Sequence, residues 1–346
     1  MKGFRLFGFF VVFALLAASC APAATPTASA PAAPTTAAPA APQPTTPPAA
    51  PAPTQAPAAA QPTTPPAAAP TVAPTAAAPA VVATIDPTKL TQKGRLLICT
   101  DFPYPPQEFF DENGDPQGLD VELGTEIAHR LGLQVVFVNS VFDTIFAAVT
   151  SGKCDIVISA TNITTDRQKQ VSMIPYFDAG QSFVVVKGNT ANINATTDLC
   201  GTSVAAESGT TEADYLQGLG DYKGKGLTQA CTTAGKKPIS TVVTQKDSDA
   251  LQQLQANKVV AYFTDSPVAA YYTVQHTDQF QLSGIAVLNA VLEGIGVPCG
   301  QADCTKAPLS GVGQAVQTAL NSMMTDGTYL KILTKWNLAN SAVKAQ

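Results

Sequence analysis

Residues 119–138 read LDVELGTEIAHRLGLQVVFV, a helix pattern that passes directly into a strand pattern. The first part places four apolar residues at four-residue steps, on one helix face: Leu119, Leu123, Ile127 and Leu131. The second part, residues 134–138, is a short run of β-branched and aromatic residues that predicts a strand. Similar apolar runs stand on either side, RLLICT at 95–100 and DIVIS at 155–159. This alternation predicts parallel strands joined by helices.

The same alternation restarts in the second half of the chain. Strand and helix patterns again take turns, with strands at 203–206, 239–243 and 259–263, and helices from Thr211 and over 248–256. Further apolar strands are expected after Gly284, and the last strong helix over 313–324. Two successive α/β units followed by a C-terminal return predict two lobes, with the last segment rejoining the first.

Two of the predicted helices carry capping signals at their starts. Asp143 is expected to be the N-cap of the helix that ends near Gly152. Thr211, with Asp214 three residues later, fits a capping box at the start of the first helix in the second unit.

The N-terminal region has the features of an export signal followed by a tether. Residues 1–19 combine a basic start, a short apolar run and small residues before Cys20, which predicts a secretory signal peptide. The Ala-Ala-Ser-Cys ending resembles a bacterial lipobox, in which Cys20 would become the lipidated first residue. Residues 20–85 are almost wholly Ala, Pro and Thr, so we expect a disordered, semi-rigid stalk. The protein is therefore expected outside the cytoplasm, anchored to the cell membrane by Cys20.

Charge and cysteine content exclude several classes of function. The formal net charge is −5 and there is no Lys/Arg cluster, which argues against nucleic-acid binding. The two His residues and the lack of a C-x-x-C pair argue against a zinc site, and no cofactor is expected. Six cysteines remain besides Cys20, an even number that favours disulfides in an exported protein. Six cysteines allow fifteen pairings.

Several polar residues come directly after predicted strands. Asp101 follows the first strand and Asp265 follows the strand at 259–263, while Ser159, Thr161 and Asn162 lie at the end of the third strand. In open α/β sheets, ligands bind beyond the carboxyl ends of the strands. These positions are therefore candidates for a binding site.

Six motifs occur along the chain in an order that resembles one known family. They are CTDFPYPPQEF, GLDVEL, SGKCDIVISATNITTDRQK, AAESGTTEADYL, AYFTDSPVAAY and TDGTYLKILTKW, between about residues 93 and 338. The chain resembles the amino-acid-binding proteins of ABC importers, solute-binding family 3. That resemblance implies an α/β fold of the type II periplasmic binding protein kind, with two lobes, two hinge strands and the ligand between them.

The resemblance also implies the domain limits and the partners. Residues 86–184 and 291–346 would form the first lobe and residues 185–290 the second, with hinges near Gln181–Lys187 and Ala290–Val297. The protein would bind a polar amino acid, perform no chemistry on it and deliver it to an ABC transporter permease. It would act as a monomer, and closure of the hinge would trap the ligand.

The resemblance assigns roles to residues at both ends of an amino acid. Arg167 would clamp the ligand carboxylate, because a guanidinium gives two parallel hydrogen bonds. Thr210 and Thr211 would be the second carboxylate contact, and Asp265 would accept the ligand ammonium. The full set of expected ligand-binding residues is Asp101, Tyr104, Phe142, Ser159, Ala160, Asn162, Arg167, Thr210, Thr211 and Asp265.

The remaining expected contacts concern the ligand backbone and side chain. Ser159 and Asn162 match positions that touch the ligand backbone, where Ala160 offers backbone atoms alone. Asp101 and Tyr104 match positions near the ligand side chain, and Phe142 resembles an aromatic residue that packs on it. Asp101 does not decide specificity, because relatives with different ligands carry Asp at this position. Gln107 stands where relatives often have an apolar residue.

One disulfide set fits the expected fold. Cys99 and Cys154 belong to strands expected to be neighbours, so a bridge between them is plausible. Cys200 and Cys231 flank the first helix of the second lobe, and Cys299 and Cys304 would close a small loop. This pairing is a hypothesis among the fifteen.

Three other functions are compatible with the same sequence. An enzyme on the same fold, such as a cyclohexadienyl dehydratase, would need a positioned general acid or base, and no His lies near a motif. A sensory lipoprotein receptor would have the same amino-acid clamp and a separate signalling partner. A purely structural surface lipoprotein would bind no amino acid.

Overall fold

The computed structural model describes residues 80–346. The predicted signal peptide, Cys20 and the stalk up to residue 79 lie outside the described residues. Within the described part, the backbone N–H of Val82 donates to Arg130 O at 2.9 Å and Ile85 is buried in a core cluster. The segment that packs on the first lobe therefore begins before Asp86. From residue 80 onward, no helix has the length and apolar character needed to cross a membrane.

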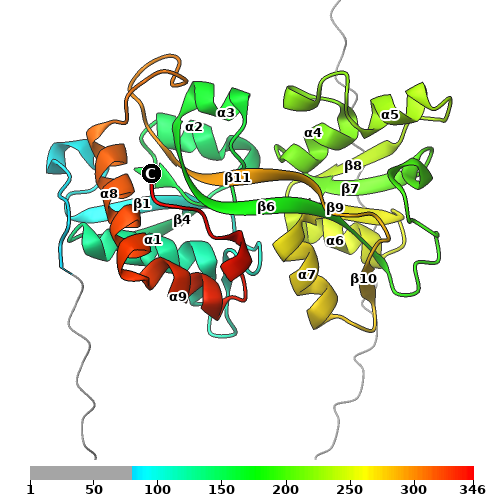
Figure 1. The fold of residues 1–346 in the computed structure, drawn as a ribbon, viewed down its shortest axis with the longest axis horizontal. Helices are drawn as coiled ribbons and strands as arrows, with labels where there is room; N and C mark the ends of the chain where they lie inside the picture. The colour runs from blue at the N-terminus through cyan, green and yellow to red at the C-terminus, as the bar shows by residue number, and fades with distance from the viewer. Residues whose placement is uncertain (1–79) are drawn as a thin grey trace, which may run out of the picture. The chain divides into compact units, whose positions relative to one another are not determined.

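The first lobe is built on parallel strands covered by helices (Figure 1). Strand β1 lies between β4 and β5 and pairs with both in parallel, and β2 and β3 form a separate small antiparallel pair. The strands are β1 (Arg95–Thr100), β2 (Phe109–Phe110), β3 (Pro116–Gln117), β4 (Gln134–Asn139) and β5 (Ile156–Val157). The helices are α1 (Leu119–Arg130), α2 (Ile145–Thr150), α3 (Thr165–Gln170), α8 (Gly311–Asp326) and α9 (Thr328–Lys335).

The second lobe repeats the arrangement with a continuous piece of chain. Strand β7 lies between β8 and β9 and pairs with both in parallel. Its strands are β7 (Ser203–Glu207), β8 (Ser240–Thr244), β9 (Ala261–Asp265) and β10 (Phe280–Leu282). Its helices are α4 (Thr211–Gln217), α5 (Leu227–Thr233), α6 (Asp247–Gln255) and α7 (Ser266–Gln275). The predicted two-lobed α/β organisation is confirmed.

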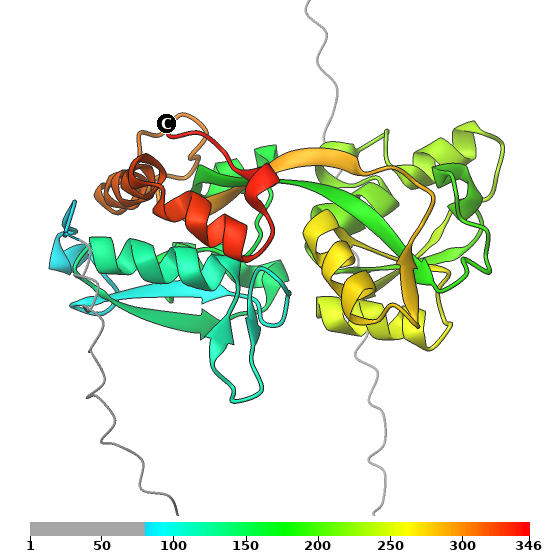
Figure 2. The same ribbon diagram turned by 60° about the horizontal axis from the view of Figure 1, so that its bottom comes forward.

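Two long antiparallel strands run from one lobe into the other, as Figure 2 shows. They are β6 (Ser172–Val186) and β11 (Leu288–Val297), and they give a strand order of β4-β1-β5-β11-β6-β9-β7-β8, with β10 on β6. Strand β6 pairs with β11 up to Gln181 and with β9 from Gln181 onward. The connection between the lobes therefore lies near Gln181, at the start of one predicted hinge segment. Hinge motion itself stays a prediction.

Each lobe has a main hydrophobic core of its own. The larger one unites apolar side chains of residues 85–179 with those of residues 295–333, so the first lobe needs both ends of the described chain. The second gathers residues between Phe183 and Phe263. Burial of aliphatic and aromatic side chains is the main stabilising contribution in each.

Both predicted capping arrangements are wrong in detail. Asp143 lies inside a short 3-10 helix, Phe142–Thr144, and the N-cap of α2 is Thr144. Helix α4 is capped one residue earlier than predicted, because the Thr210 side chain accepts a hydrogen bond from Ala213 N. Thr211 is thus the first helical residue and forms no capping box with Asp214.

The structure contains the three hypothesised disulfides. Cys99–Cys154, Cys200–Cys231 and Cys299–Cys304 have Cα–Cα separations of 5.7, 5.5 and 5.7 Å. The first staples β1 to the residue pair before β5, and the second joins α5 to the segment before β7. None of these three links one lobe to the other.

Candidate functional site

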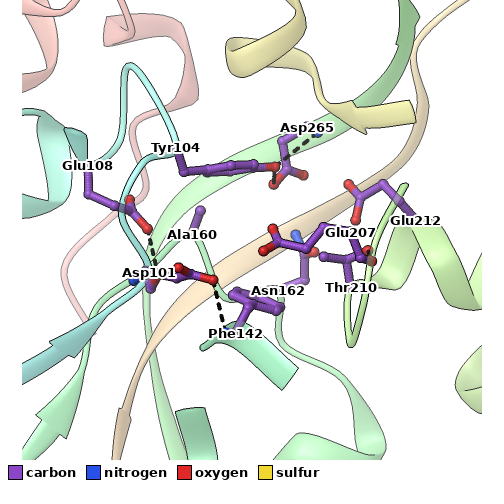
Figure 3. Close-up of a pocket in the computed structure, with 11 residues that line it drawn as sticks. Asp101, Tyr104, Glu108, Phe142, Ala160, Asn162, Glu207, Thr210, Glu212 and Asp265 are labelled. Carbon is purple, nitrogen blue, oxygen red and sulfur yellow. Dashed lines mark hydrogen bonds between the residues drawn. The ribbon is translucent and has the colours of Figure 1, made fainter. Parts of the chain in front are cut away.

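A narrow pocket lies where the strand ends of the two lobes meet (Figure 3). Eleven residues line it: Asp101, Tyr104, Glu108, Phe142, Ser159, Ala160, Asn162, Glu207, Thr210, Glu212 and Asp265. Eight of the ten residues predicted from the sequence are among them; Arg167 and Thr211 are not. Four of these eight, Asp101, Ser159, Asn162 and Asp265, also follow from the strand-end rule, while Thr161 does not line the pocket.

The backbone brings these residues together from elements far apart in the sequence. Asp101 follows β1, and the stretch from Ser159 to Asn162 follows β5, its parallel neighbour. From the second lobe, Glu207 ends β7 and Asp265 ends β9, again parallel neighbours. The carboxyl ends of both parallel sets therefore face the same space.

The first-lobe wall is held by a chain of hydrogen bonds. The Ser159 hydroxyl accepts from Asp101 N at 2.9 Å and donates to Glu108 Oε1 at 2.5 Å. Ala160 takes a backbone φ of 44°, which an L-residue adopts at a cost, and its N–H donates to Asp120 Oδ2 at 2.8 Å. Buried Asp120 thus fixes the bend that carries Ser159 and Ala160 into the pocket.

Asp101 uses both carboxylate oxygens within the protein. Its Oδ2 accepts a hydrogen bond from Phe142 N at 2.9 Å, and its Oδ1 pairs with the Lys246 ammonium of the second lobe. The first contact positions the ring of Phe142 on the pocket wall.

The second-lobe wall centres on Asp265. Its Oδ2 accepts from the Tyr104 hydroxyl of the first lobe at 2.8 Å, while its buried Oδ1 has no hydrogen-bond partner. Burial and the neighbouring Glu212 charge raise the pKa of Asp265 well above its ordinary value. Burial likewise raises the pKa of Glu212, whose carboxyl lies within hydrogen-bonding reach of Asp265. The two form an acid pair in which a proton or another cation relieves the repulsion.

Arg167 and Thr211 stand behind the pocket wall and touch it through Asn162. The Arg167 guanidinium donates to Asn162 O at 2.8 Å and to Gly209 O at 3.0 Å, and lies 5.2 Å from the centre of the Phe142 ring. The Thr211 hydroxyl donates to Asn162 Oδ1 at 2.6 Å. Burial lowers the pKa of Arg167, and the charges of Glu212 and Asp265 oppose that shift. The guanidinium is therefore close to the acid pair.

Sequence reasoning missed three lining carboxyl groups: Glu108, Glu207 and Glu212. A usable signal existed for Glu207, because it ends a buried strand as Asp265 does. Glu108 and Glu212 lie inside quoted motifs, PPQEF and TTEAD, but no spacing rule distinguishes them from surface residues. Their burial follows from the packing of the lobes.

The pocket is strongly acidic. Five lining residues carry carboxyl groups, and the lining contains no Lys or Arg. Burial, with the charges of Asp247 and Glu212, raises the pKa of Glu207 to about 9. Burial and the Asp120 charge raise the pKa of Glu108 well above its usual range. Residues 80–346 contain no group of three His, Cys, Asp or Glu side chains arranged to hold a metal ion.

Comparisons with known proteins agree with this geometry. The family model of "Bacterial extracellular solute-binding proteins, family 3" matches residues 96–339. The L-cystine-binding protein TcyJ of Escherichia coli (strain K12) is 24% identical over 249 residues, which is 72% of this chain and 84% of that protein. ABC transporter arginine-binding protein 1 of the same strain is 26% identical over 234 residues, 67% of this chain and 86% of that protein.

Solved structures lead to the same family. An ancestral arginine-binding protein bound to arginine has a TM-score of 0.60 and 34% identity, over 70% of this chain and 98% of that one. An ancestral amino acid-binding protein described as a precursor of cyclohexadienyl dehydratase has a TM-score of 0.57 and 30% identity, over 70% and 95%. The chain therefore belongs to the bacterial extracellular solute-binding proteins of family 3, and its fold is the two-lobed type II periplasmic binding protein fold.

Proposed function

We propose that this protein is the solute-binding component of an ABC importer for an amino acid with a cationic side chain, such as arginine. One observation carries the choice of ligand: five carboxyl groups line the pocket, and the lining contains no Lys or Arg. The relatives named for arginine and the neighbour bound to arginine support the same choice.

The charge balance favours a ligand with more positive charge than an ordinary zwitterion has. A zwitterion offers one ammonium, which a single carboxylate can pair. Ionised carboxylates buried without a partner are costly, so the pocket either holds protons or receives cations. A second cation at the far end of the ligand would satisfy acidic groups that a neutral side chain leaves unpaired.

The α-ammonium of the ligand is assigned to the pair Glu212 and Asp265. The unpartnered Asp265 Oδ1 is an acceptor in a buried position, as this contact requires. The α-carboxylate is assigned to Arg167, which uses two of its five N–H donors on Asn162 O and Gly209 O. Thr210 and Thr211 lie on the same side and complete that end of the site.

The side chain of the ligand is assigned to the opposite end of the pocket. Figure 3 places Glu108 and Asp101 together at that end, away from Glu212 and Thr210. Glu207 lies between the two ends and has a buried oxygen without a partner. Phe142 provides an aromatic face for a cationic group.

The finer organisation of the protein belongs to the same proposal. We infer that Cys20 carries a lipid, that the Ala/Pro/Thr-rich segment after it acts as a tether, and that hinge closure of a monomer presents the ligand to a permease. A sensory role would use the same pocket with a signalling partner. Genes for a permease and an ATPase beside this one would favour transport, whereas a sensor kinase gene would favour sensing.

Titration calorimetry with a matched pair of ligands tests the proposed function. Citrulline has the shape of arginine without its charge, so arginine should bind at least about 100-fold more tightly, a difference of about 2.7 kcal/mol. A thermal-shift screen over the common amino acids and zwitterions gives the wider specificity, because a ligand that binds the native state raises Tm. Equal binding of arginine and citrulline would reject the cationic ligand, and no binding of any amino acid would reject the function.

A second candidate, a dehydratase of the cyclohexadienyl type, has one observation in its favour. Glu212 is buried and lines the pocket, and burial raises the pKa of its carboxyl group, which could therefore act as a general acid. Incubation with prephenate or arogenate tests it, with Glu212→Gln as the variant that should abolish turnover. Absence of turnover by the unmodified protein rejects this candidate.

A further inference from the structure

Lys246 forms an ion pair that joins the two lobes. It lies in the second lobe, at the N-cap position of α6, and its ammonium meets Asp101 Oδ1 at the end of β1. The other ion pairs found in residues 80–346 all lie within the first lobe; they are Arg130–Glu126, Arg130–Asp326, Lys169–Asp166 and Lys335–Glu122. The contact of Lys246 with Asp101 therefore depends on how the lobes meet.

Asp101 differs from the other acidic residues of the pocket because it has an ion-pair partner within the protein. The side chain of Lys246 is 26% exposed while that of Asp101 is 5% exposed, so the ammonium reaches inward from the surface to a buried carboxylate. With Phe142 N on Oδ2, both oxygens of Asp101 have partners. Glu108, Glu207, Glu212 and Asp265 form no ion pair with a Lys or Arg anywhere in the described chain.

We propose that Lys246 is a specificity-determining residue that withholds Asp101 from the ligand. The inference rests on the proposed function and concerns the far end of the same pocket. An ammonium already occupies the Asp101 carboxylate, so a ligand cation that reaches it must displace Lys246 and leave that ammonium without its partner. The cation of the ligand is then recognised by Glu207, and long cationic side chains bind less tightly than the acidic lining would allow.

The alternative role for Lys246 is a simple closing contact between lobes. A closing contact would act on every ligand alike, because it changes the closed state and not the far end of the pocket. Competition for Asp101 lowers the affinity only of ligands that carry a cation at the end of the side chain. The two roles are separated by a pair of ligands that differ in this charge.

Calorimetry on Lys246→Met with arginine and citrulline makes this separation. Methionine keeps an unbranched side chain and removes the ammonium. We expect the affinity for arginine to rise about tenfold or more, equivalent to about 1.4 kcal/mol, while that for citrulline changes less than about threefold. Lys246→Arg keeps the charge and should behave like the unmodified protein. Lys258→Met removes an exposed lysine of the same lobe that forms no ion pair in the described chain, and it is the matched control.

Each result decides the question. An equal gain or loss for both ligands would assign Lys246 to closure, and a selective loss of arginine binding would make it a supporting part of the site; both overturn the proposal. If the unmodified protein binds neither ligand and no other amino acid in the thermal-shift screen, the proposed function fails. Arginine binding gained by Lys246→Met would then still support the role of Lys246, and its continued absence would reject that role as well.

Discussion

Two pairs of carboxyl groups, one from each lobe, stand beside the pocket in different surroundings. In the first lobe Glu108 and Asp120 lie within hydrogen-bonding reach of each other, and donors of the same lobe complete the pair: Ser159, Ala160 N and the Tyr176 hydroxyl. In the second lobe Glu212 and Asp265 both line the pocket, and the hydroxyl that donates to Asp265 is Tyr104 of the opposite lobe.

The difference indicates that one pair of carboxyl groups supports the fold of the first lobe and that the other serves ligand binding. The pair Glu108 and Asp120 receives all its hydrogen-bond donors from the first lobe, and it holds the bend at Ala160. The pair Glu212 and Asp265 receives the Tyr104 donor across the gap, so that contact is lost whenever the lobes separate. We therefore expect changes in the second pair to act on binding and changes in the first to act on folding.

The largest expected effect is on Asp265. Replacing Asp265 by Asn removes the charge assigned to the ligand ammonium, and arginine binding should weaken by about 3–5 kcal/mol, because a buried charge loses its partner. Calorimetry at pH 7.5 measures this change. Asp278→Asn, an exposed substitution in the same lobe, is the control and should leave binding unchanged. Unchanged affinity in Asp265→Asn would remove the second-lobe pair from the site.

The next effect concerns Arg167, which lies beside the same pair. Arg167→Ala should weaken arginine binding by about 3 kcal/mol, because the ligand carboxylate would be buried without its cation. Agmatine has the same guanidinium and no carboxylate, so its affinity should change little. If both ligands lose affinity equally, Arg167 supports the wall around Asn162 and does not clamp the carboxylate.

The pH dependence of binding reports on Glu207. Burial raises its pKa from 4.5 to about 9, so the free protein holds a proton there at neutral pH. A cation binds the ionised form and releases that proton, so arginine affinity should rise with pH between about 4.5 and 9, by up to about tenfold per unit. Isothermal titration across this range measures the slope. Glu207→Gln should flatten it, and Glu112→Gln at the surface should not; a slope that persists in Glu207→Gln would assign the proton to another group.

The smallest effect is expected for Glu108→Gln. Burial raises the pKa of Glu108 and so favours its neutral form, which the amide of glutamine resembles in shape and charge. The substitution should therefore change arginine binding by less than about 1 kcal/mol. Chemical denaturation of the same variant measures its effect on folding. A loss of binding as large as that of Asp265→Asn would reverse the comparison and place a ligand cation on the first-lobe pair.

Most of the fold could be predicted because its elements carry clear periodic patterns. Strand β1 begins and ends at the predicted residues, and α1 differs by one residue at its end. Helix α7 was not predicted, because its sequence SPVAAYYTVQ has no distinct apolar stripe. Only three of its residues are buried. The caps at Asp143 and Thr211 were wrong because neighbouring residues of similar chemistry compete for the same position.

The candidate site could be predicted as far as strand ends define it. Asp101, Ser159, Asn162 and Asp265 follow from that rule, and the motif resemblance adds Tyr104, Phe142, Ala160 and Thr210 to the lining. The acid pair Glu212–Asp265 and the ion pair Lys246–Asp101 both join residues more than fifty positions apart. The first forms within the folded second lobe, and the second forms when the two lobes meet. A single sequence contains no signal for these contacts.

The division of the cores affects the order in which the chain can fold. A chain exported N-terminus first supplies every residue of the second core, Phe183 to Phe263, before the last helices emerge. The first core still lacks Val316, Leu320 and Leu333 at that moment, and the side of α1 that packs on α8 and α9 stays uncovered. The lobe that begins the chain is therefore the last to be completed. Truncations near the C-terminus should damage that lobe while leaving the other able to fold.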